Sequence, residues 1–129
     1  MRNLSARHRS LRAVYAQSWA LLQPAEQTLF SALSIFRNGF TLNAAEAVVQ
    51  GTVADLSGLI DKSLLRHQRT GCYDVHEGLR QFGAEKLAEN PSTATHFGDA
   101  HARYYMHYLI SQSAKLRGLD FLMKLLRKS

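Results

Sequence analysis

The sequence lacks the features that cross-link a small domain through disulfides or metal ions, or anchor it in a membrane. It holds a single cysteine, Cys72, which excludes an internal disulfide and a zinc site built from cysteines. Its longest apolar runs are four residues, Ala13 to Ala16 and Trp19 to Leu22, whereas a membrane span needs about 20. These absences predict an intracellular, cytoplasmic chain with no membrane partner.

The composition is that of an ordinary globular domain. Of the 129 residues, 46% are hydrophobic and 20% are charged, which excludes a disordered tail. A chain of this length buries roughly 60 to 70% of its unfolded surface, enough for one packed core without staples. We expect one domain with at most a fragment of a second.

The positive charge lies at the two ends of the chain. Residues 1–12 carry four arginines and no acid, and residues 115–129 carry five basic residues against one acid. The middle holds seven basic and nine acidic residues, so the net charge of +6 arises from +4 at each end and −2 in the middle. An arginine-rich start without acids also fits an organellar transit peptide, but its apolar stripe favours a helix of the domain.

Apolar residues recur at helical spacing through the first half of the chain. The pattern predicts helices over 11–22 with Ser10 as N-cap, from Pro24 to the turn at 37–39, from Thr41 or Asn43 to Gln50, and over 53–62. One core is predicted to contain Trp19, Leu22, Leu29, Phe30, Leu33, Phe36, Leu56, Leu59, Leu65 and Leu79.

The apolar period changes from 3.6 to 2 after Lys62. Two short runs, 64–68 and 72–75, flank Gly71 in the pattern of a β-hairpin. Helical spacing then returns in three further segments. They are predicted over 79–87, ending before Pro91, from Ser92 or Thr93 to about Leu116, and as a short terminal segment over 119–126 beyond Gly118.

This order of elements predicts the fold class. The chain should be mainly α with a small two-stranded β-hairpin: a winged helix, that is a helix-turn-helix plus wing, followed by a long helix. We divide it into a winged-helix regulatory domain, residues 1–90, and a helical extension, residues 91–129, which could open a helical-repeat array. The apolar residues of the terminal segment would then lack a partner within this chain.

Several segments resemble the region that follows the nucleotide-binding domain in bacterial signal-transducing STAND ATPases. The N-terminal part of the resemblance rests on Arg7 to Ala13, Ser18-Trp19, Leu22 to Gln27, Leu33 to Phe36 and Gly39 to Leu42. The later part rests on Leu59 to Leu65, Tyr73, Leu79 to Phe82, and His101 with Tyr104-Tyr105. The motifs keep the family's order and approximate spacing over residues 7–108.

The resemblance implies a regulatory module of AfsR-like or LuxR-type ATPase regulators, related to NB-ARC proteins such as plant resistance proteins and apoptotic activating factors. In that family a P-loop domain binds ADP or ATP, the winged helix closes on the ADP form, and tetratricopeptide-like helical repeats sense a signal. The expected partners are therefore a nucleotide-binding domain and a helical-repeat sensor. This chain has no GxxxxGK[ST] sequence, so we expect no catalysis and no cofactor in the isolated chain.

The resemblance also points to a candidate nucleotide-sensing site. Val75-His76-Glu77 is similar to the Met-His-Asp motif of plant resistance proteins, in which the histidine approaches the ADP phosphates. An imidazole can donate a hydrogen bond to a phosphate, and Glu77 would favour a helix start through the helix dipole. Without the nucleotide-binding domain, His76 and Glu77 would be an ordinary histidine and a helix-starting glutamate.

The alternative function is DNA binding by a winged-helix transcriptional regulator. The helix before the wing, over 53–62, carries Asp55 and Asp61 and a single base, Lys62, which disfavours entry into the major groove. Only the hairpin could contact a nucleic-acid backbone. Its candidate residues are Arg66, His67 and Arg69.

The sequence gives little support for metal binding or nucleophilic catalysis. His96, His101 and His107 are five and six residues apart, which does not align two metal ligands on one helix face. Tyr104 and Tyr108, at i and i+4, are predicted to pack, and Cys72 is predicted to pack as a small apolar residue. No Gly-x-Ser-x-Gly turn is present, and nothing in the sequence activates the cysteine.

Overall fold

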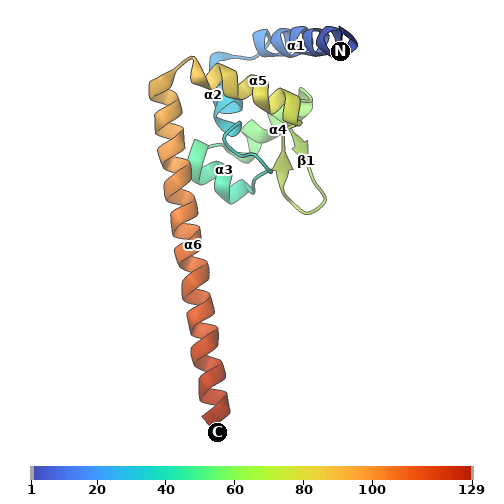
Figure 1. Ribbon diagram of the computed structural model, residues 1–129. Helices are drawn as coiled ribbons and strands as arrows, with labels where there is room; N and C mark the ends of the chain where they lie inside the picture. The colour runs from blue at the N-terminus through green and yellow to red at the C-terminus, as the bar shows by residue number, and fades with distance from the viewer. Residues whose placement is uncertain (1, 129) are drawn as a thin grey trace.

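The chain folds as a winged helix with one helix crossing its N-terminal side and a long helix leaving it (Figure 1). The computed structural model describes the backbone of residues 2–128 and the side chains of residues 9–127. The elements in chain order are α1 (Arg2–Ala20), α2 (Pro24–Leu33), α3 (Leu42–Val49), α4 (Val53–Asp61), β1 (Arg66–His67), β2 (Tyr73–Asp74), α5 (Glu77–Ala88) and α6 (Pro91–Lys128). The predicted fold class is confirmed, whereas the division at residue 90 stays a prediction.

Local capping fixes the helices of the winged helix. The side chain of Thr41 accepts a hydrogen bond from the backbone of Ala44, so Thr41 rather than Asn43 begins α3. Thr52 and Asp55 cap α4 reciprocally, each side chain accepting from the other's backbone N–H at 3.0 to 3.1 Å. These polar signals are the reason that the predicted limits of α3 and α4 hold to within one residue.

The wing is shorter than predicted, but the loop before α3 extends it. β1 and β2 pair antiparallel, with Arg66 opposite Asp74. Phe40 and Tyr73 exchange two backbone hydrogen bonds of 2.8 Å, which attach the preceding loop to the edge of β2. Gly39, at φ +93°, permits this contact, because a Cβ there would lie 2.9 Å from the carbonyl oxygen of Tyr73.

The core lies where α2, α3, α4 and α5 meet the base of the wing. Eight of the ten predicted core residues are buried in it, and Trp19 and Leu29 are partly buried against its edge. Trp19 contributes aromatic contacts to Phe30 and Phe82, with ring centroids 6.4 and 6.2 Å apart. The predicted single core is therefore confirmed, with α1 as its cover rather than its centre.

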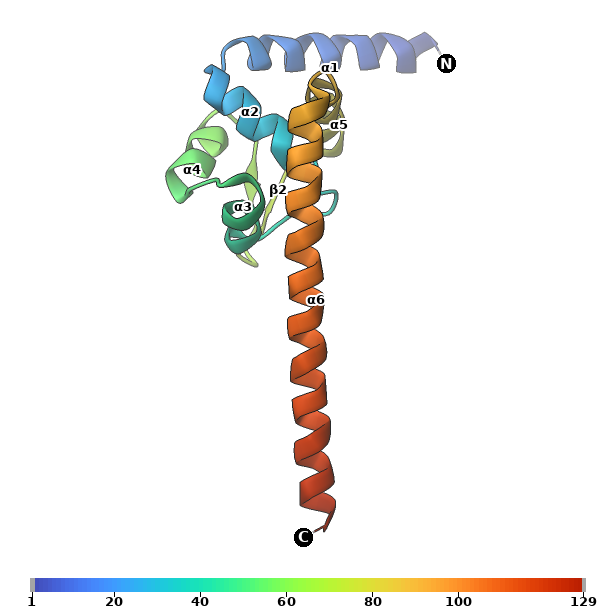
Figure 2. The same cartoon turned by 90° about the vertical axis from the view of Figure 1, so that its left-hand side faces the viewer.

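The predicted limits of the first helix were wrong. α1 begins at Arg2, so Ser10 lies inside the helix instead of capping it. No proline or glycine interrupts residues 2–20, and serine is tolerated at an exposed helical position. The N-terminal part of α1 extends past the body (Figures 1 and 2). Leu11 and Val14 of the predicted apolar stripe are exposed, whereas Tyr15 and Trp19 pack against the core.

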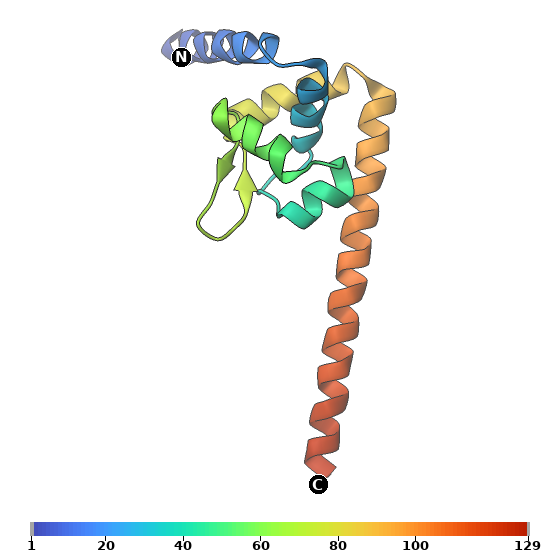
Figure 3. The same cartoon turned by 180° about the vertical axis from the view of Figure 1, so that it is seen from behind.

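The last helix was also predicted with wrong limits. α6 begins at Pro91 and runs through Gly118 without a break, because one exposed glycine costs only about 1 kcal/mol relative to alanine. Its first half packs on α3 and α5, and its second half extends well past the body (Figures 2 and 3). The terminal apolar residues are exposed, as the sequence predicted. Tyr104 packs against the core, but Tyr108, predicted to pack with it, is 48% exposed because the body ends before it.

Candidate functional site

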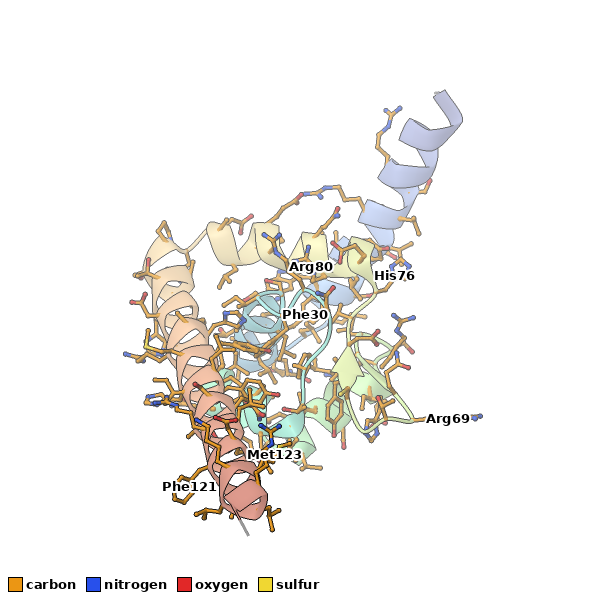
Figure 4. All side chains as sticks on the ribbon, turned by 60° about the horizontal axis from the view of Figure 1, so that its bottom comes forward. Phe30, Arg69, His76, Arg80, Phe121 and Met123 are labelled. Carbon is orange, nitrogen blue, oxygen red and sulfur yellow. The ribbon has the colours of Figure 1, made fainter. Side chains whose placement is uncertain are left out.

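The predicted nucleotide-sensing residues lie where β2 passes into α5. His76 is the N-cap residue of α5, and its side chain makes no capping hydrogen bond. The imidazole is exposed on the surface of the domain, on the side where α1 crosses α5 (Figure 4). It is therefore accessible to a group brought from outside this chain.

Glu77, the second predicted site residue, is held by Arg80. The Arg80 guanidinium donates through Nε and Nη2 to the two carboxylate oxygens of Glu77, at 2.9 and 2.7 Å. This pairing lowers the pKa of the Glu77 carboxyl to about 2. Glu77 does lie in the first turn of α5, as predicted, but its carboxylate is engaged by an arginine that the sequence analysis did not select.

Arg80 also fixes the junction to the rest of the domain. Its Nη1 donates to the carbonyl oxygen of Ser34 at 2.9 Å, just beyond the end of α2. The side chain of Arg80 is only 13% exposed, so water competes weakly for these hydrogen bonds. The spacing of Glu77 and Arg80, at i and i+3, was a signal for the ion pair, whereas the contact with Ser34 depends on the tertiary fold.

A small pocket of about 130 Å³ separates His76 from α1. Tyr15 faces Gly78 across it, and a Cβ on Gly78 would lie 3.0 Å from the Tyr15 hydroxyl. Arg12 and Glu85, which also line the pocket, form an ion pair between α1 and α5. The α1 helix is thus seated on α5 by side chains next to His76, so a displacement of α1 would change the surroundings of the imidazole.

The wing residues predicted for the alternative function are not equally accessible to phosphate. Arg66 forms a two-pronged pair with Asp74, at 3.1 and 3.0 Å, and His67 stacks on Tyr73 with ring centroids 4.5 Å apart. Arg69 lies at the wing tip and points away from the body and from His76 (Figure 4). Of these three predicted contacts, Arg69 has the geometry to meet a nucleic-acid backbone.

The surface of α4 is not basic. Lys62 lies just after α4 and pairs with Glu26 at 2.6 Å, and the hydrogen bond from Lys62 lowers the pKa of the Glu26 carboxyl. Asp55 lies in the first turn of the helix, where it completes the N-cap, and Asp61 is its last residue. The carboxylates thus outnumber the cation on the helix that would read bases.

The histidines of α6 are His96, His101 and His107. His101 packs against Phe36 and Tyr105 with ring centroids 5.4 and 4.7 Å apart, and burial lowers its pKa. Within the side chains that the structure describes, no group of three or more histidine, cysteine or carboxylate residues could hold a metal ion. Cys72 is half-buried in the wing.

Comparisons with known proteins give relatives at the level of sequence and of fold. No family model matches the chain. Proteins named "Putative HTH-type transcriptional regulator" from Mycobacterium bovis and Mycobacterium tuberculosis are 35% identical to it over 118 residues. The match spans 84% of this chain and 13% of those regulators, so the chain corresponds to a small part of their length.

A solved structure with the same fold is described as a STAND protein, the class that the sequence motifs resemble. It is a Signal Transduction ATPase with Numerous Domains from Pyrococcus horikoshii, with a tetratricopeptide repeat sensor. The two superpose with a TM-score of 0.52 at 18% identity, over 82% of this chain and 19% of that protein. This likeness shows a shared fold.

Among the helices of residues 2–128, none combines the length and the apolar composition that a membrane span requires.

Proposed function

We propose that this chain is the winged-helix regulatory module of a larger STAND-type signalling ATPase. In this proposal it packs on a nucleotide-binding domain and couples that domain to a helical-repeat sensor that continues from α6. The module itself is non-catalytic, and ADP or ATP binds the nucleotide-binding domain of the parent protein. The shared fold with the archaeal STAND protein and the small share of both relatives that the chain spans support this view.

One observation carries the proposal: His76 is exposed at a junction whose neighbouring residues are held by hydrogen bonds. Its neighbour Glu77 is clamped by Arg80, and Arg80 is fixed to Ser34. His76 thus lies next to a helix start that is held in place, and its side chain makes no hydrogen bond that caps α5. A nucleotide phosphate presented by an adjoining domain would accept a hydrogen bond from the imidazole N–H.

The experiment compares His76→Ala with the wild type in the full-length parent protein. Loss of a hydrogen bond to a charged phosphate should weaken ADP binding by about 1.5 to 3 kcal/mol and ATP binding much less. Because a ligand shifts an equilibrium only by its differential affinity, the open form should become more populated. Isothermal titration with both nucleotides, together with the melting temperature, measures these effects.

His107→Ala is the matched control, because His107 is an exposed histidine on α6, away from the junction. It should leave both nucleotide affinities unchanged. Equal effects of His76→Ala on ADP and ATP, or a lower melting temperature with unchanged affinities, would make His76 a structural residue and remove it from the site.

DNA binding by the wing is the second candidate function. The names of the mycobacterial relatives favour it, although the matched segment is 13% of their length. The exposed Arg69 would contribute a backbone contact, but the acidic surface of α4 opposes base reading. Electrophoretic mobility shifts with duplexes of different sequence, at several salt concentrations, separate this function from regulation of a nucleotide-binding domain.

A further inference from the structure

The Tyr15 hydroxyl and the His76 imidazole both lie beside Gly78, where α1 crosses α5 (Figure 1). The hydroxyl oxygen is 3.0 Å, and the Nδ1 atom of His76 is 3.7 Å, from the point where a Cβ of Gly78 would stand. Tyr15 belongs to α1, whereas His76 is the N-cap residue of α5. The packing of the two helices thus brings a second hydrogen-bonding group to the predicted sensing residue.

The fold uses neither of these polar groups. Within the side chains that the structure describes, the Tyr15 hydroxyl and the His76 imidazole make no hydrogen bond. Tyr15 is partly exposed and His76 is exposed, so a group from outside the chain can reach both. Each side chain can donate one hydrogen bond to such a group.

The ring of Tyr15, in contrast to its hydroxyl, is held by the fold. Its centroid lies 6.1 Å from that of Phe82, which is buried on α5. The guanidinium of Arg12, one turn earlier on α1, lies 5.5 Å from the centroid of the same Phe82 ring. These contacts keep the Tyr15 hydroxyl beside His76 for as long as α1 is seated on α5.

The pocket between α1 and α5 has the size and the charge balance for one phosphate group. Its volume of about 130 Å³ is several times the roughly 30 Å³ that a water molecule takes up in the liquid. Glu85, which lines the pocket, is paired with Arg12, and Glu77, next to His76 in sequence, is paired with Arg80. Each nearby carboxylate therefore has its own guanidinium, which reduces its repulsion of an anion.

Gly78 leaves the space between the two donors open. It is not at a positive φ, and alanine has the higher helix propensity, so the backbone of α5 does not require a glycine here. The approach of Tyr15 does require it, because a methyl group would stand 3.0 Å from the hydroxyl oxygen. The same methyl group would occupy the space beside both donors.

We propose that Tyr15 is a second phosphate-binding residue, whose hydroxyl donates to the same phosphate of ADP as the His76 imidazole. A phosphate group carries several acceptor oxygens, so it can accept from both side chains at once, and its charge strengthens both hydrogen bonds. This inference rests on the proposed function, because the adjoining nucleotide-binding domain supplies the phosphate. It adds that bound ADP holds α1 on α5, since the two donors come from different helices.

Tyr15→Phe in the full-length parent protein tests the role of the hydroxyl, because it keeps the ring that contacts Phe82. The dissociation constant of ADP, measured by isothermal titration, should rise roughly tenfold or more, and that of ATP much less. The melting temperature should stay unchanged, since the hydroxyl makes no hydrogen bond within the described part of the chain. Tyr108→Phe is the matched control: it removes a hydroxyl from an exposed tyrosine of α6 and should leave both affinities unchanged.

Gly78→Ala tests the position of the phosphate without removing a donor. The added methyl group should also weaken ADP binding, because it fills the space beside Tyr15 and His76. Gly98→Ala is the matched control, since it adds the same methyl group to α6 at a position with no atom within 4 Å. A Gly78→Ala variant with the ADP affinity of the wild type would contradict a phosphate bound beside Gly78.

Comparison with His76→Ala separates this inference from the proposed function. If His76→Ala weakens ADP binding and Tyr15→Phe does not, the role of Tyr15 is overturned and the proposed function stands. If neither variant weakens ADP binding, both are overturned. A loss of ADP affinity in Tyr15→Phe alone would overturn the shared phosphate, and equal losses for ADP and ATP in that variant would make Tyr15 a structural residue.

Discussion

Arg80 and Ser34, 46 residues apart in sequence, are joined by a hydrogen bond of 2.9 Å between the guanidinium Nη1 and the backbone carbonyl oxygen. The same guanidinium holds Glu77 at the start of α5. One side chain thus links the end of α2, the first turn of α5 and the junction that carries His76.

Arg80→Met should destabilise the domain by about 1.5 to 3 kcal/mol, the range for hydrogen bonds to charged groups in a poorly hydrated site. Arg80→Lys should recover part of this loss, since it keeps the charge but not the planar fork. Urea denaturation followed by circular dichroism measures both. Arg69→Met, at the wing tip, is the control and should change the free energy of unfolding by less than about 0.5 kcal/mol.

Stability should depend on the ionisation of Glu77 in acid. The folded-state pKa is lowered from 4.5 to about 2, so the carboxylate's contribution is complete above pH 4.5. It is lost as the pH falls from 4.5 toward 2, when the folded protein takes up the proton. Glu77→Gln should therefore destabilise the domain at neutral pH, and its difference from the wild type should shrink through this window. Urea titrations at several pH values measure it; a difference independent of pH would contradict the pairing with Arg80.

Trp19→Ala should destabilise the domain by about 2 kcal/mol. Complete burial would give roughly 3 to 5 kcal/mol, but Trp19 is partly buried between Phe30 and Phe82. Thermal unfolding by calorimetry checks the value. Leu21→Ala serves as the control, because Leu21 is 80% exposed and should lose almost nothing. Equal losses for the two variants would mean that α1 does not sit on α5 in solution.

Any binding to duplex DNA should be independent of sequence and should collapse between low and physiological salt. Counterion release from phosphates would supply its free energy, since the surface of α4 offers little for reading bases. Arg69→Ala should lower the slope of log K against log salt by about 1. Fluorescence anisotropy with two unrelated duplexes tests this. A preference of a hundredfold or more for one duplex at physiological salt would favour the transcriptional-regulator function.

The elements with polar start signals were predictable from the sequence. Thr41 and Thr52 mark helix starts because each side chain supplies an acceptor to an N–H that the helix leaves unpaired. Gly71 marks the wing because its φ of +89° disfavours other residues. These signals are local, so they survive without knowledge of the tertiary structure.

The long helices and the arginine link were less predictable. Ser10 and Gly118 have the residue types of a start and a stop, yet neither ends a helix, because the surrounding propensity outweighs one unfavourable residue. The acceptor that Arg80 finds on Ser34 lies on another helix, and no local pattern indicates it. His76 could be selected as a site residue from the family resemblance. The pocket beside it could not be predicted, because it forms only when α1 packs on α5.

The pairing of Phe40 with Tyr73 has a mechanical consequence. Its two hydrogen bonds join the edge of the wing to the loop that enters α3 two residues later, and α3 in turn packs on α6. A displacement of β2 should therefore also move α3, and through α3 the long helix α6.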